Sequence, residues 1–584
     1  MTDLVLDVRQ LQVAFTSENQ TNLAVDRISF QIERGKTLGI VGESGSGKSV
    51  TSLALMGLIQ KPGRVIGGEI FYKAAPEADP IDLQSLPEWE RRTYRGGEIA
   101  MIFQEPMSSL NPVYNVEFQL TEAILLHQNV TPAQARQQAI ARLQEVQLPA
   151  EVMKRYPHEL SGGQLQRVMI AMAIASNPTL LIADEPTTAL DVTVQATILQ
   201  LLRDLCQARQ MSLIFITHDL GVIAELVDEV AVMYRGKIVE QGAIEQIFKH
   251  PQHPYTRGLL ACRPRLDQKL VLLPTVADYM SVETDPETQE LIIQERVPDA
   301  NLQAQVSLEA DKQRLEALIK QKPLLSVQKL RVGYPVRNLL AAGQKYFMAV
   351  NNVSFDLYPG ETLGLVGESG CGKSTLARAI LRLTQPLGGD IWFRGENIAQ
   401  LPARSKRLRQ LRREMQIVFQ NPYNSLNPRL TIGQAIAEPL VIHNLKRDKK
   451  KRLERVQYLL ERVGLNPQWV NRYPHELSGG QRQRVCIARA LAIEPQFIIC
   501  DESVSALDVS VQAQVLNLLK ELQAEFQLTY IFISHDLSVV KFMGDRIIVM
   551  NQGKIEEIGP AEQIYRAPQQ DYTKQLIAAI PQGL

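Results

Sequence analysis

Short apolar runs alternate with stretches of helical periodicity along most of this chain, and the alternation occurs twice. In the first half, the apolar runs cover 37–41, 179–183 and 212–217. The matching runs of the second half cover 362–366, 496–500 and 529–534. Strand-length apolar runs between helices are typical of an α/β core with a mainly parallel sheet. A more helical stretch interrupts the pattern in each half, at about 113–175 and 430–491.

The pattern is doubled because the sequence repeats itself. VGESGSGKS at 41–49 returns as VGESGCGKS at 366–374, and RYPHELSGGQ at 155–164 returns unchanged at 472–481. ADEPTTALDVTVQA and FITHDL of the first half also have counterparts in the second, CDESVSALDVSVQA and FISHDL. The first copy is longer between its Gly-rich loop and Gln104, and we place the extra residues in a surface loop at 73–87.

The repeats divide the chain into two homologous domains, at 1–265 and 324–584, joined by a linker at 266–323. The linker is polar and acid-rich, with the run VETDPETQE and a weak helical pattern near 308–319. Such a composition favours a flexible connector.

Composition removes several classes of function. Lys+Arg and Asp+Glu are both 63, so the formal net charge is zero and the broad basic field of a nucleic-acid-binding protein is absent. The five cysteines form no C-x-x-C pair, which argues against a zinc site or a disulfide framework. No run reaches the roughly 18 apolar residues of a membrane span, and the N-terminus lacks the pattern of a signal peptide. We therefore expect a chain that lies beside a membrane, if it acts at one.

Each Gly-rich loop follows an apolar run and precedes a helical pattern, which is the context of a phosphate-binding loop. Glycines let backbone N–H groups converge on phosphates at a helix N-terminus. Lys48 and Lys373 are expected to reach the β- and γ-phosphates of a nucleotide, and Ser49 and Ser374 to bind Mg²⁺. The residues assigned to the nucleotide in the two loops are Gly42, Ser44, Gly45, Gly47, Lys48, Ser49 and Val50, and Gly367, Ser369, Gly370, Gly372, Lys373, Ser374 and Thr375.

An Asp-Glu pair follows a later apolar run in each repeat. A carboxylate at the end of a buried strand needs compensation, and Mg²⁺ supplies it for Asp184 and Asp501. Glu185 and Glu502 are then placed to orient the attacking water. A single Asp-Glu pair after a strand favours a solvated turn, but two such pairs behind phosphate loops favour catalysis.

Two further pairs of equivalent residues leave alternatives open. Phe15 and Tyr334 precede the phosphate loops and could be core residues or could stack on adenine. His218 and His535 follow apolar runs, where an isolated histidine would most simply cap a strand end.

The combination of LSGGQ at 160–164 and 477–481 with a phosphate loop and an Asp-Glu pair resembles the ATP-binding-cassette superfamily. The resemblance covers both repeats and implies two tandem cassettes, each with a P-loop α/β core, a helical subdomain and an antiparallel β subdomain. It implies a head-to-tail pair that encloses two ATP molecules. Lys48 would share one ATP with Ser478, Gly479, Gly480 and Gln481, and Lys373 the other with Ser161, Gly162, Gly163 and Gln164.

The same resemblance assigns roles to other residues. It makes Gln104 and Gln420 sensors of Mg²⁺ or water that also contact membrane subunits. It places Asp191 and Asp508 in the loop that joins the two sites. His218 and His535 would contact the γ-phosphate, and so join Glu185 and Glu502 as catalytic residues.

A narrower resemblance rests on FQEPMSSLNP, FQNPYNSLNP and HPYTRGLL, which are similar to segments of the ATPases of dipeptide, oligopeptide, glutathione and nickel importers. It implies two transmembrane permease subunits, an extracytoplasmic substrate-binding protein, a peripheral position at the cytoplasmic face of the inner membrane, and a short peptide as cargo. Departures include Ser503 in place of the usual proline, Leu165 in place of arginine, and QDYTKQL in place of HPYT. Iron–sulfur relatives carry several cysteines after HPYT; this chain has only Cys262 there, so no cluster is expected.

Other twin-cassette proteins are weaker matches. Soluble translation factors join their cassettes by a basic helical arm, whereas this linker is acidic. DNA-repair cassettes insert zinc-binding C-x-x-C pairs, and sugar importers have an incomplete second site. Nickel importers use similar ATPases, but as two separate chains. An ATP-driven peptide importer is the leading hypothesis.

Overall fold

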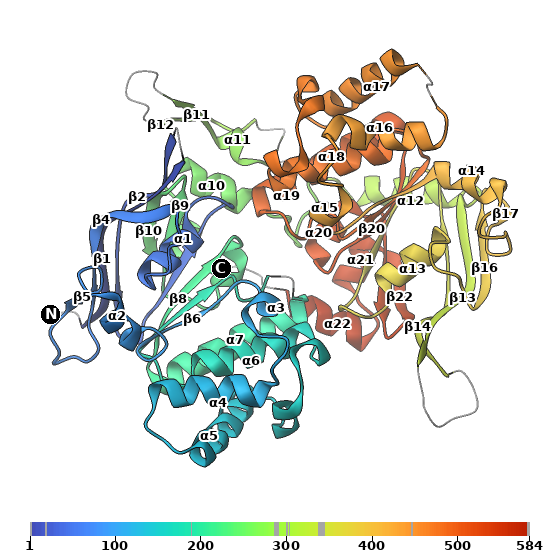
Figure 1. Ribbon diagram of the computed structural model, residues 1–584. Coiled ribbons are helices and arrows are strands. Elements are labelled where there is room, and N and C mark those ends of the chain that lie inside the picture. The colour runs from blue at the N-terminus through green and yellow to red at the C-terminus, as the bar shows by residue number, and fades with distance from the viewer. Residues whose placement is uncertain are drawn as a thin grey trace.

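The computed structural model describes residues 3–17, 20–188, 190–284, 291–299, 302, 304–336, 345–445 and 448–580. The two halves of the chain form two similar domains that lie side by side (Figure 1). Each contains a six-stranded sheet, a four-stranded antiparallel sheet and a group of helices. The two-domain α/β architecture expected from the repeats is confirmed.

The six-stranded sheets are the cores of the domains. In the first domain the strand order is β10-β9-β3-β8-β7-β6, and all neighbours pair in parallel except β10 with β9. Its strands are β3 (Thr37–Val41), β6 (Ile99–Ile102), β7 (Leu180–Asp184), β8 (Ser212–Thr217), β9 (Glu229–Tyr234) and β10 (Lys237–Ala243). The second domain repeats this order with β15 (Thr362–Val366), β18 (Met415–Val418), β19 (Phe497–Asp501), β20 (Thr529–Ile533), β21 (Arg546–Asn551) and β22 (Lys554–Pro560). The central strands are covered on both faces, which is why they are continuous apolar runs.

The four-stranded sheets are the antiparallel subdomains that the family resemblance implies. Their orders are β2-β1-β4-β5 and β14-β13-β16-β17. The strands are β1 (Leu4–Ser17), β2 (Gln20–Glu33), β4 (Gly63–Tyr72), β5 (Ile81–Asp82), β13 (Leu325–Val336), β14 (Lys345–Leu357), β16 (Gly388–Phe393) and β17 (Glu396–Asn397). β5 lies in the segment that we expected to be a surface loop, so this segment contains a short edge strand.

The helices fall into three groups. The helical subdomains contain α4 (Val116–His127), α5 (Pro132–Glu145) and α6 (Gly162–Ala173), and α16 (Ile432–Ile442), α17 (Lys449–Arg462) and α18 (Gly479–Leu491). Around the core sheets lie α1 (Lys48–Leu55), α2 (Glu88–Tyr94), α3 (Pro106–Ser109), α7 (Val192–Arg209), α8 (Leu220–Ile223), α13 (Lys373–Ile380), α14 (Lys406–Glu414), α15 (Pro422–Ser425), α19 (Val509–Phe526) and α20 (Leu537–Met543). After the last strand of each core sheet come α9 (Ile244–Lys249) and α10 (Pro254–Ala261), and α21 (Ala561–Arg566) and α22 (Asp571–Ala578). Within the described residues, no helix is long and apolar enough to cross a membrane.

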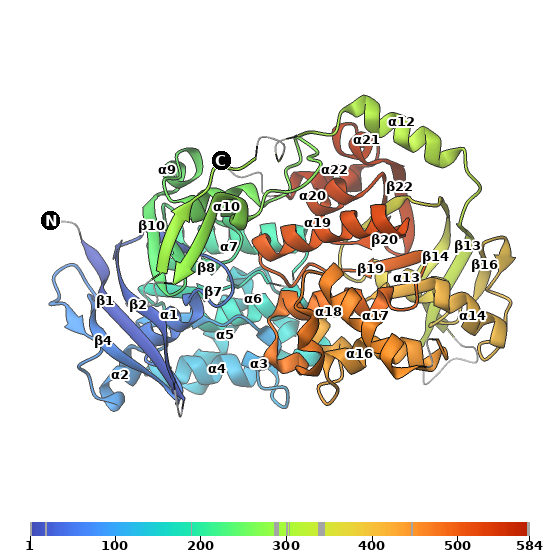
Figure 2. The same cartoon turned by 90° about the horizontal axis from the view of Figure 1, so that it is seen from above.

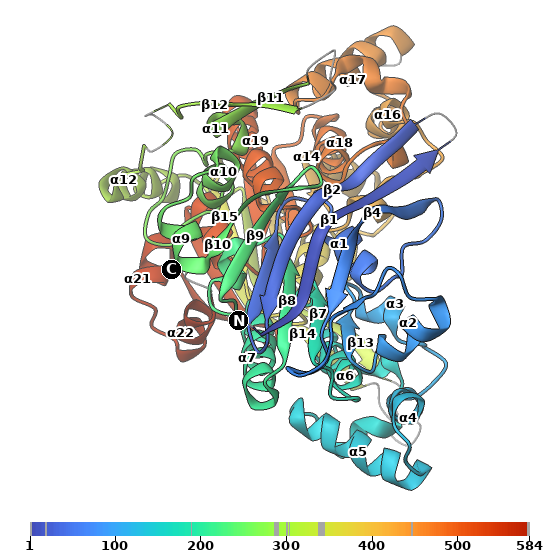
Figure 3. The same cartoon turned by 90° about the vertical axis from the view of Figure 1, so that its left-hand side faces the viewer.

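The linker differs from our expectation of a flexible connector, because its described part has defined structure. It contains α11 (Val276–Tyr279), the hairpin β11 (Met280–Thr284) and β12 (Leu291–Glu295), and α12 (Leu308–Ile319). Figure 2 shows α12 on the second domain beside α21, and Figure 3 shows α10 and α11 beside α19.

Side chains of the second domain bind part of the linker, while Met280 of β11 is buried in the core cluster of the first domain. The side chain of Asn517 makes two hydrogen bonds to the backbone of the linker residue Leu273. It accepts from the N–H of Leu273 at 2.9 Å and donates to the carbonyl of Leu273 at 2.8 Å. Arg314 of α12 donates to Asp545 at 2.7 Å. Leu273 is also buried in the core cluster of the second domain. The polar composition of the linker predicts flexibility, because composition alone does not show that linker residues have hydrogen-bond partners in the second domain.

Candidate functional site: two nucleotide sites between the domains

The first phosphate loop connects β3 to α1 through residues 42–47. Gly42 and Gly47 have φ values of 157° and 103°. A Cβ atom on Gly42 would lie 2.2 Å from the carbonyl oxygen of Met233, and one on Gly47 would lie 2.5 Å from that of Ala24. Only glycine therefore fits these two positions, and the loop can turn tightly enough for α1 to begin at Lys48.

The lysine of each loop is folded over the loop backbone. Lys48 Nζ donates to the carbonyls of Gly42 at 2.8 Å and Glu43 at 2.9 Å. Lys373 makes the same two bonds in the second loop, at 2.7 and 3.0 Å. Burial lowers the pKa of Lys48, although nearby carboxylates, Glu185 first, oppose this effect. Each amine thus lies at the centre of its loop, where the phosphates of a nucleotide would replace the carbonyls as partners.

A serine and an aspartate meet beside each loop. Ser49 donates to Asp184 at 3.0 Å, and Ser374 donates to Asp501 at 2.9 Å. Burial raises the pKa of Asp184 to about 6 and also raises the pKa of Asp501. Hydroxyl and carboxylate oxygens are the ligands that Mg²⁺ prefers, and a cation would offset the cost of burying the carboxylate. The residues present fit a magnesium ion.

Glu185 lies at the centre of a hydrogen-bonded group in the first domain. Its Oε2 accepts from Gln104 Nε2 at 3.0 Å and from the hydroxyl of Thr188 at 3.0 Å, and lies 3.3 Å from Nδ1 of His218. Burial raises the pKa of Glu185, but His218, Lys48 and Thr188 outweigh it and the pKa falls to about 2. Its φ of 46° is unusual for a residue with a side chain. The carboxylate is therefore ionised and held in one orientation.

The second domain repeats this group with looser contacts. Glu502 has a φ of 49° and accepts from Gln420 at 2.6 Å, while His535 Nδ1 lies 3.9 Å away. Burial raises the pKa of Glu502, but His535 outweighs it and the net pKa is lowered. Ser505, which matches Thr188, donates to the backbone carbonyl of Glu502 at 2.9 Å instead of its carboxylate.

The two aromatic residues proposed for adenine have different surroundings. Phe15 is half-buried and packs against the core cluster of the first domain. The Tyr334 side chain is 42% exposed, and its hydroxyl lies 3.5 Å from that of Thr375 in the first turn of α13. Tyr334 thus lies beside the second phosphate loop. The position of Phe15 is compatible both with a core residue and with stacking on adenine.

The two domains meet head to tail at the phosphate loops. The hydroxyl of Thr193 on α7 donates to Glu368 in the second loop at 2.8 Å. Asp191 accepts from the backbone N–H of Ser369 at 2.7 Å. In the other direction, Ser510 on α19 donates to Glu43 of the first loop. Each loop therefore faces the start of a long helix in the other domain.

Each LSGGQ segment begins a helix of its helical subdomain. Ser161 and Gln164 form a capping box at the start of α6, and Ser478 and Gln481 form another at the start of α18. These bonds are internal to each helix. Among the described residues, no hydrogen bond joins either segment to the opposite phosphate loop, so their pairing with Lys373 and Lys48 stays a prediction.

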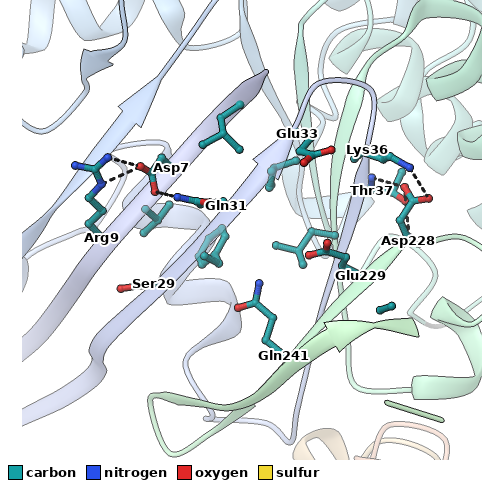
Figure 4. Close-up of a pocket in the computed structure, with 16 residues that line it drawn as sticks. Asp7, Arg9, Ser29, Gln31, Glu33, Lys36, Thr37, Asp228, Glu229 and Gln241 are labelled. Atoms are coloured by element: carbon teal, nitrogen blue, oxygen red, sulfur yellow. Dashed lines mark hydrogen bonds and ion pairs between the residues drawn. The ribbon is translucent and has the colours of Figure 1, made fainter. Parts of the chain in front are cut away.

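Both histidines face a small space between the domains. A cavity of about 110 Å³ is lined by His218 and His535 together with Gln195 and Gln512 of the long helices. A wider cavity of about 770 Å³ lies away from the phosphate loops, between β2 and β9 (Figure 4). Its lining contains the ion pairs of Arg9 with Asp7 at 2.6 Å and Lys36 with Asp228 at 3.6 Å, and it lacks a glycine-rich loop. It does not have the features of a nucleotide site.

The sequence analysis missed the residues that join the domains and support the loops. Glu43, Glu368, Thr193 and Ser510 all lie inside the repeated motifs, but their partners are in the opposite domain. The hydroxyl of Tyr255, in the HPYT segment, accepts from the N–H of Glu43 at 3.0 Å. Only the repetition of these residue types in both halves could have indicated them.

Comparison with known proteins gives two family matches. The ABC transporter family matches residues 25–188 and 350–505. The family described as oligopeptide/dipeptide transporter, C-terminal region, matches residues 239–287 and 557–583.

Similar proteins extend over nearly the whole chain. The glutathione import ATP-binding protein GsiA of Pectobacterium atrosepticum is 49% identical over 99% of this chain and 89% of its own length. The protein of the same name from Escherichia coli O157:H7 gives the same identity and shares. Among solved structures, a dimeric post-hydrolysis ATP-binding cassette bound to ADP and Pi is 30% identical, covering 41% of this chain and 98% of that one, with a TM-score of 0.37.

The chain belongs to the ABC transporter family of ATP-binding cassette proteins. Within that family it is the ATP-hydrolysing subunit of an importer of the oligopeptide and dipeptide type, with both cassettes in one chain. The translation-factor, nickel and sugar alternatives are not favoured.

Proposed function

We propose that this chain binds two Mg-ATP molecules between its domains and uses their hydrolysis to drive uptake of short peptides, with glutathione as the first candidate. The proposal of ATP hydrolysis rests on one observation: a group of lysine, glutamate, glutamine and histidine is repeated around Glu185 and Glu502. The cargo rests on the 49% identity over 99% of the chain to glutathione import ATP-binding proteins.

The chain's own residues provide the steps of hydrolysis. Lys48 and Lys373 exchange their loop carbonyls for the β- and γ-phosphates. Glu185 accepts a hydrogen bond from the attacking water and aligns it with the γ-phosphate, while Gln104 and His218 hold the carboxylate in place. The N–H groups at the starts of α6 and α18 would donate to the γ-phosphate across the interface.

Magnesium fits beside each loop. Ser49 with Asp184, and Ser374 with Asp501, would hold the ion, with Gln104 and Gln420 close to its water ligands. When bound, Mg²⁺ neutralises charge on the phosphate oxygens.

Two permease subunits are the proposed partners, and they would place the chain at the cytoplasmic face of the inner membrane. Apolar side chains are exposed beside both glutamine loops: Phe103 is 39% exposed, Met107 60% and Tyr423 63%. Such side chains mark an interaction surface. An extracytoplasmic binding protein would deliver the peptide to the assembled transporter.

Crosslinking tests this docking surface. Cysteines placed at Ser108 and Asn424, beside the exposed apolar residues, should each capture a membrane subunit in the assembled transporter. A cysteine at the exposed Glu521 of α19 is the matched control and should capture none. If neither loop cysteine reacts in an active transporter, the docking surface is wrong.

Uptake measurements test the cargo. Deletion of the gene should abolish uptake of labelled glutathione and dipeptides and give resistance to toxic peptide analogues. The wild-type gene should restore uptake, and a Lys48→Ala, Lys373→Ala gene should not. If peptide uptake persists in the deletion strain while nickel or sugar uptake disappears, the cargo assignment fails and the ATPase assignment stands.

A further inference from the structure

The segment after each core sheet reaches back to a phosphate loop through a tyrosine. Tyr255 of α10 is fully buried, and its hydroxyl accepts from the backbone N–H of Glu43 at 3.0 Å. In the second domain, the hydroxyl of Tyr572 on α22 accepts from the N–H of Glu368 at 3.2 Å. The same contact forms twice, although HPYT of the first segment is replaced by QDYT in the second.

The peptide group that each tyrosine contacts is one of the two that hold the lysine. The peptide between Gly42 and Glu43 donates through its N–H to Tyr255 and accepts through its C=O from Lys48 at 2.8 Å. The peptide between Gly367 and Glu368 is held in the same way, and its C=O lies 2.7 Å from Lys373 Nζ. Glycine at the first position leaves the orientation of this peptide free, so the two hydrogen bonds fix it.

The residue held by each tyrosine also makes the contact with the other domain. Glu43 accepts from Ser510, and Glu368 accepts from Thr193 at 2.8 Å. The ring of Tyr255 is itself supported by Tyr234, at 4.5 Å between centroids. A continuous line of contacts therefore runs from the C-terminal segment of each domain, through its phosphate loop, to the long helix of the opposite domain.

We propose that Tyr255 and Tyr572 are positioning residues of the two ATP sites. Each hydroxyl orients the first peptide of its phosphate loop, and with it the interdomain glutamate and the carbonyl that holds the lysine before nucleotide binds, so that the loop is preformed for phosphate. The C-terminal segment of each domain is then a structural part of an ATP site. The inference rests on the proposed role of Lys48 and Lys373 in binding phosphate.

Phenylalanine substitution tests the inference because it removes the hydroxyl and keeps the ring. Tyr255→Phe with Tyr572→Phe should raise the KM for ATP about five- to tenfold, the size expected for one buried neutral hydrogen bond, with kcat within about twofold. Tyr530→Phe is the matched control: this tyrosine is also fully buried, and its hydroxyl donates to the carbonyl of Leu519 at 3.1 Å. It should lower Tm without changing the KM.

Hydrogen–deuterium exchange provides a second readout with an internal control. In Tyr255→Phe, exchange should speed up in peptides covering 42–47 and remain unchanged in those covering 367–372; Tyr572→Phe should do the reverse. If both tyrosine variants lower Tm as Tyr530→Phe does, while the KM and loop exchange stay at wild-type values, the positioning role is refuted. If Lys48→Ala with Lys373→Ala leaves ATP binding intact, the proposed site itself fails.

Discussion

Replacing Glu185 and Glu502, the proposed catalytic residues, by glutamine should nearly abolish hydrolysis and leave ATP bound. The pKa of about 2 keeps Glu185 ionised at neutral pH, so Glu185→Gln removes a full negative charge from the site. The amide oxygen can still accept from Gln104 and Thr188, which bond to a single carboxylate oxygen at 3.0 Å each. The fold and the nucleotide contacts should therefore persist, and the loss should fall on the chemical step.

The expected size follows from the role of the carboxylate. Removal of a group that orients and activates the nucleophile lowers turnover by roughly 10²- to 10³-fold, which corresponds to about 2.7–4 kcal/mol in activation free energy. ATP affinity should not fall, because the substitution removes a negative charge near the γ-phosphate. Steady-state phosphate release and the nucleotide content of the purified protein measure the two effects.

The single substitutions test whether both sites work. Glu185→Gln and Glu502→Gln should each lower hydrolysis, and the double variant should lower it further. Wild-type phosphate release from the double variant would refute the mechanism. If one single variant equals the double and the other is silent, hydrolysis at two sites is refuted.

Three further outcomes follow from particular contacts. Thr188→Val removes the hydroxyl that donates to the Glu185 carboxylate, and should slow phosphate release about three- to tenfold. Ser505→Ala should have little effect, because the Ser505 hydroxyl donates to a backbone carbonyl. Equal rates of phosphate release in the two variants would contradict this difference. Arg546→Met should cost about 3–5 kcal/mol in urea unfolding of the second domain, because it leaves the fully buried Glu361, 2.7 Å away, unpaired. Lys36→Met, which removes an exposed lysine 3.6 Å from Asp228 in the first domain, should cost less than about 1 kcal/mol, and equal costs would refute the argument. Anaerobically purified protein should contain no stoichiometric iron and show no charge-transfer absorption, and either signal would overturn the absence of a cluster.

The sequence predicts the candidate site residues that lie within one motif, and the structure brings several of them together. Lys48, Ser49 and the Asp-Glu pair were assigned because each follows an apolar run, and parallel strands place their carboxyl ends at one edge of a sheet. The structure brings Ser49 within 3.0 Å of Asp184, although they are far apart in the chain.

Contacts between motifs could not be predicted from one sequence. Nothing in the HPYT segment predicts the hydrogen bond between Tyr255 and Glu43, because a tyrosine in an apolar stretch is most simply interpreted as a core residue. Ser510 and Glu43 belong to different domains, and their contact depends on how the domains are oriented. The prediction of a flexible linker was wrong for the same reason, because the hydrogen-bond partners of Arg314 and Leu273 lie in the second domain.

The attachment of the linker to the second domain affects how the cassettes find each other. Two separately made cassettes would pair by diffusion, and each could also pair with a copy of itself. Here Leu273 of the linker is bound by Asn517 of the second domain, while Met280 of β11 is buried in the core cluster of the first domain, so the linker contacts both domains. Short tethers give effective concentrations in the millimolar range. A tether attached to both domains should therefore favour pairing of the cassettes within one chain over pairing between copies.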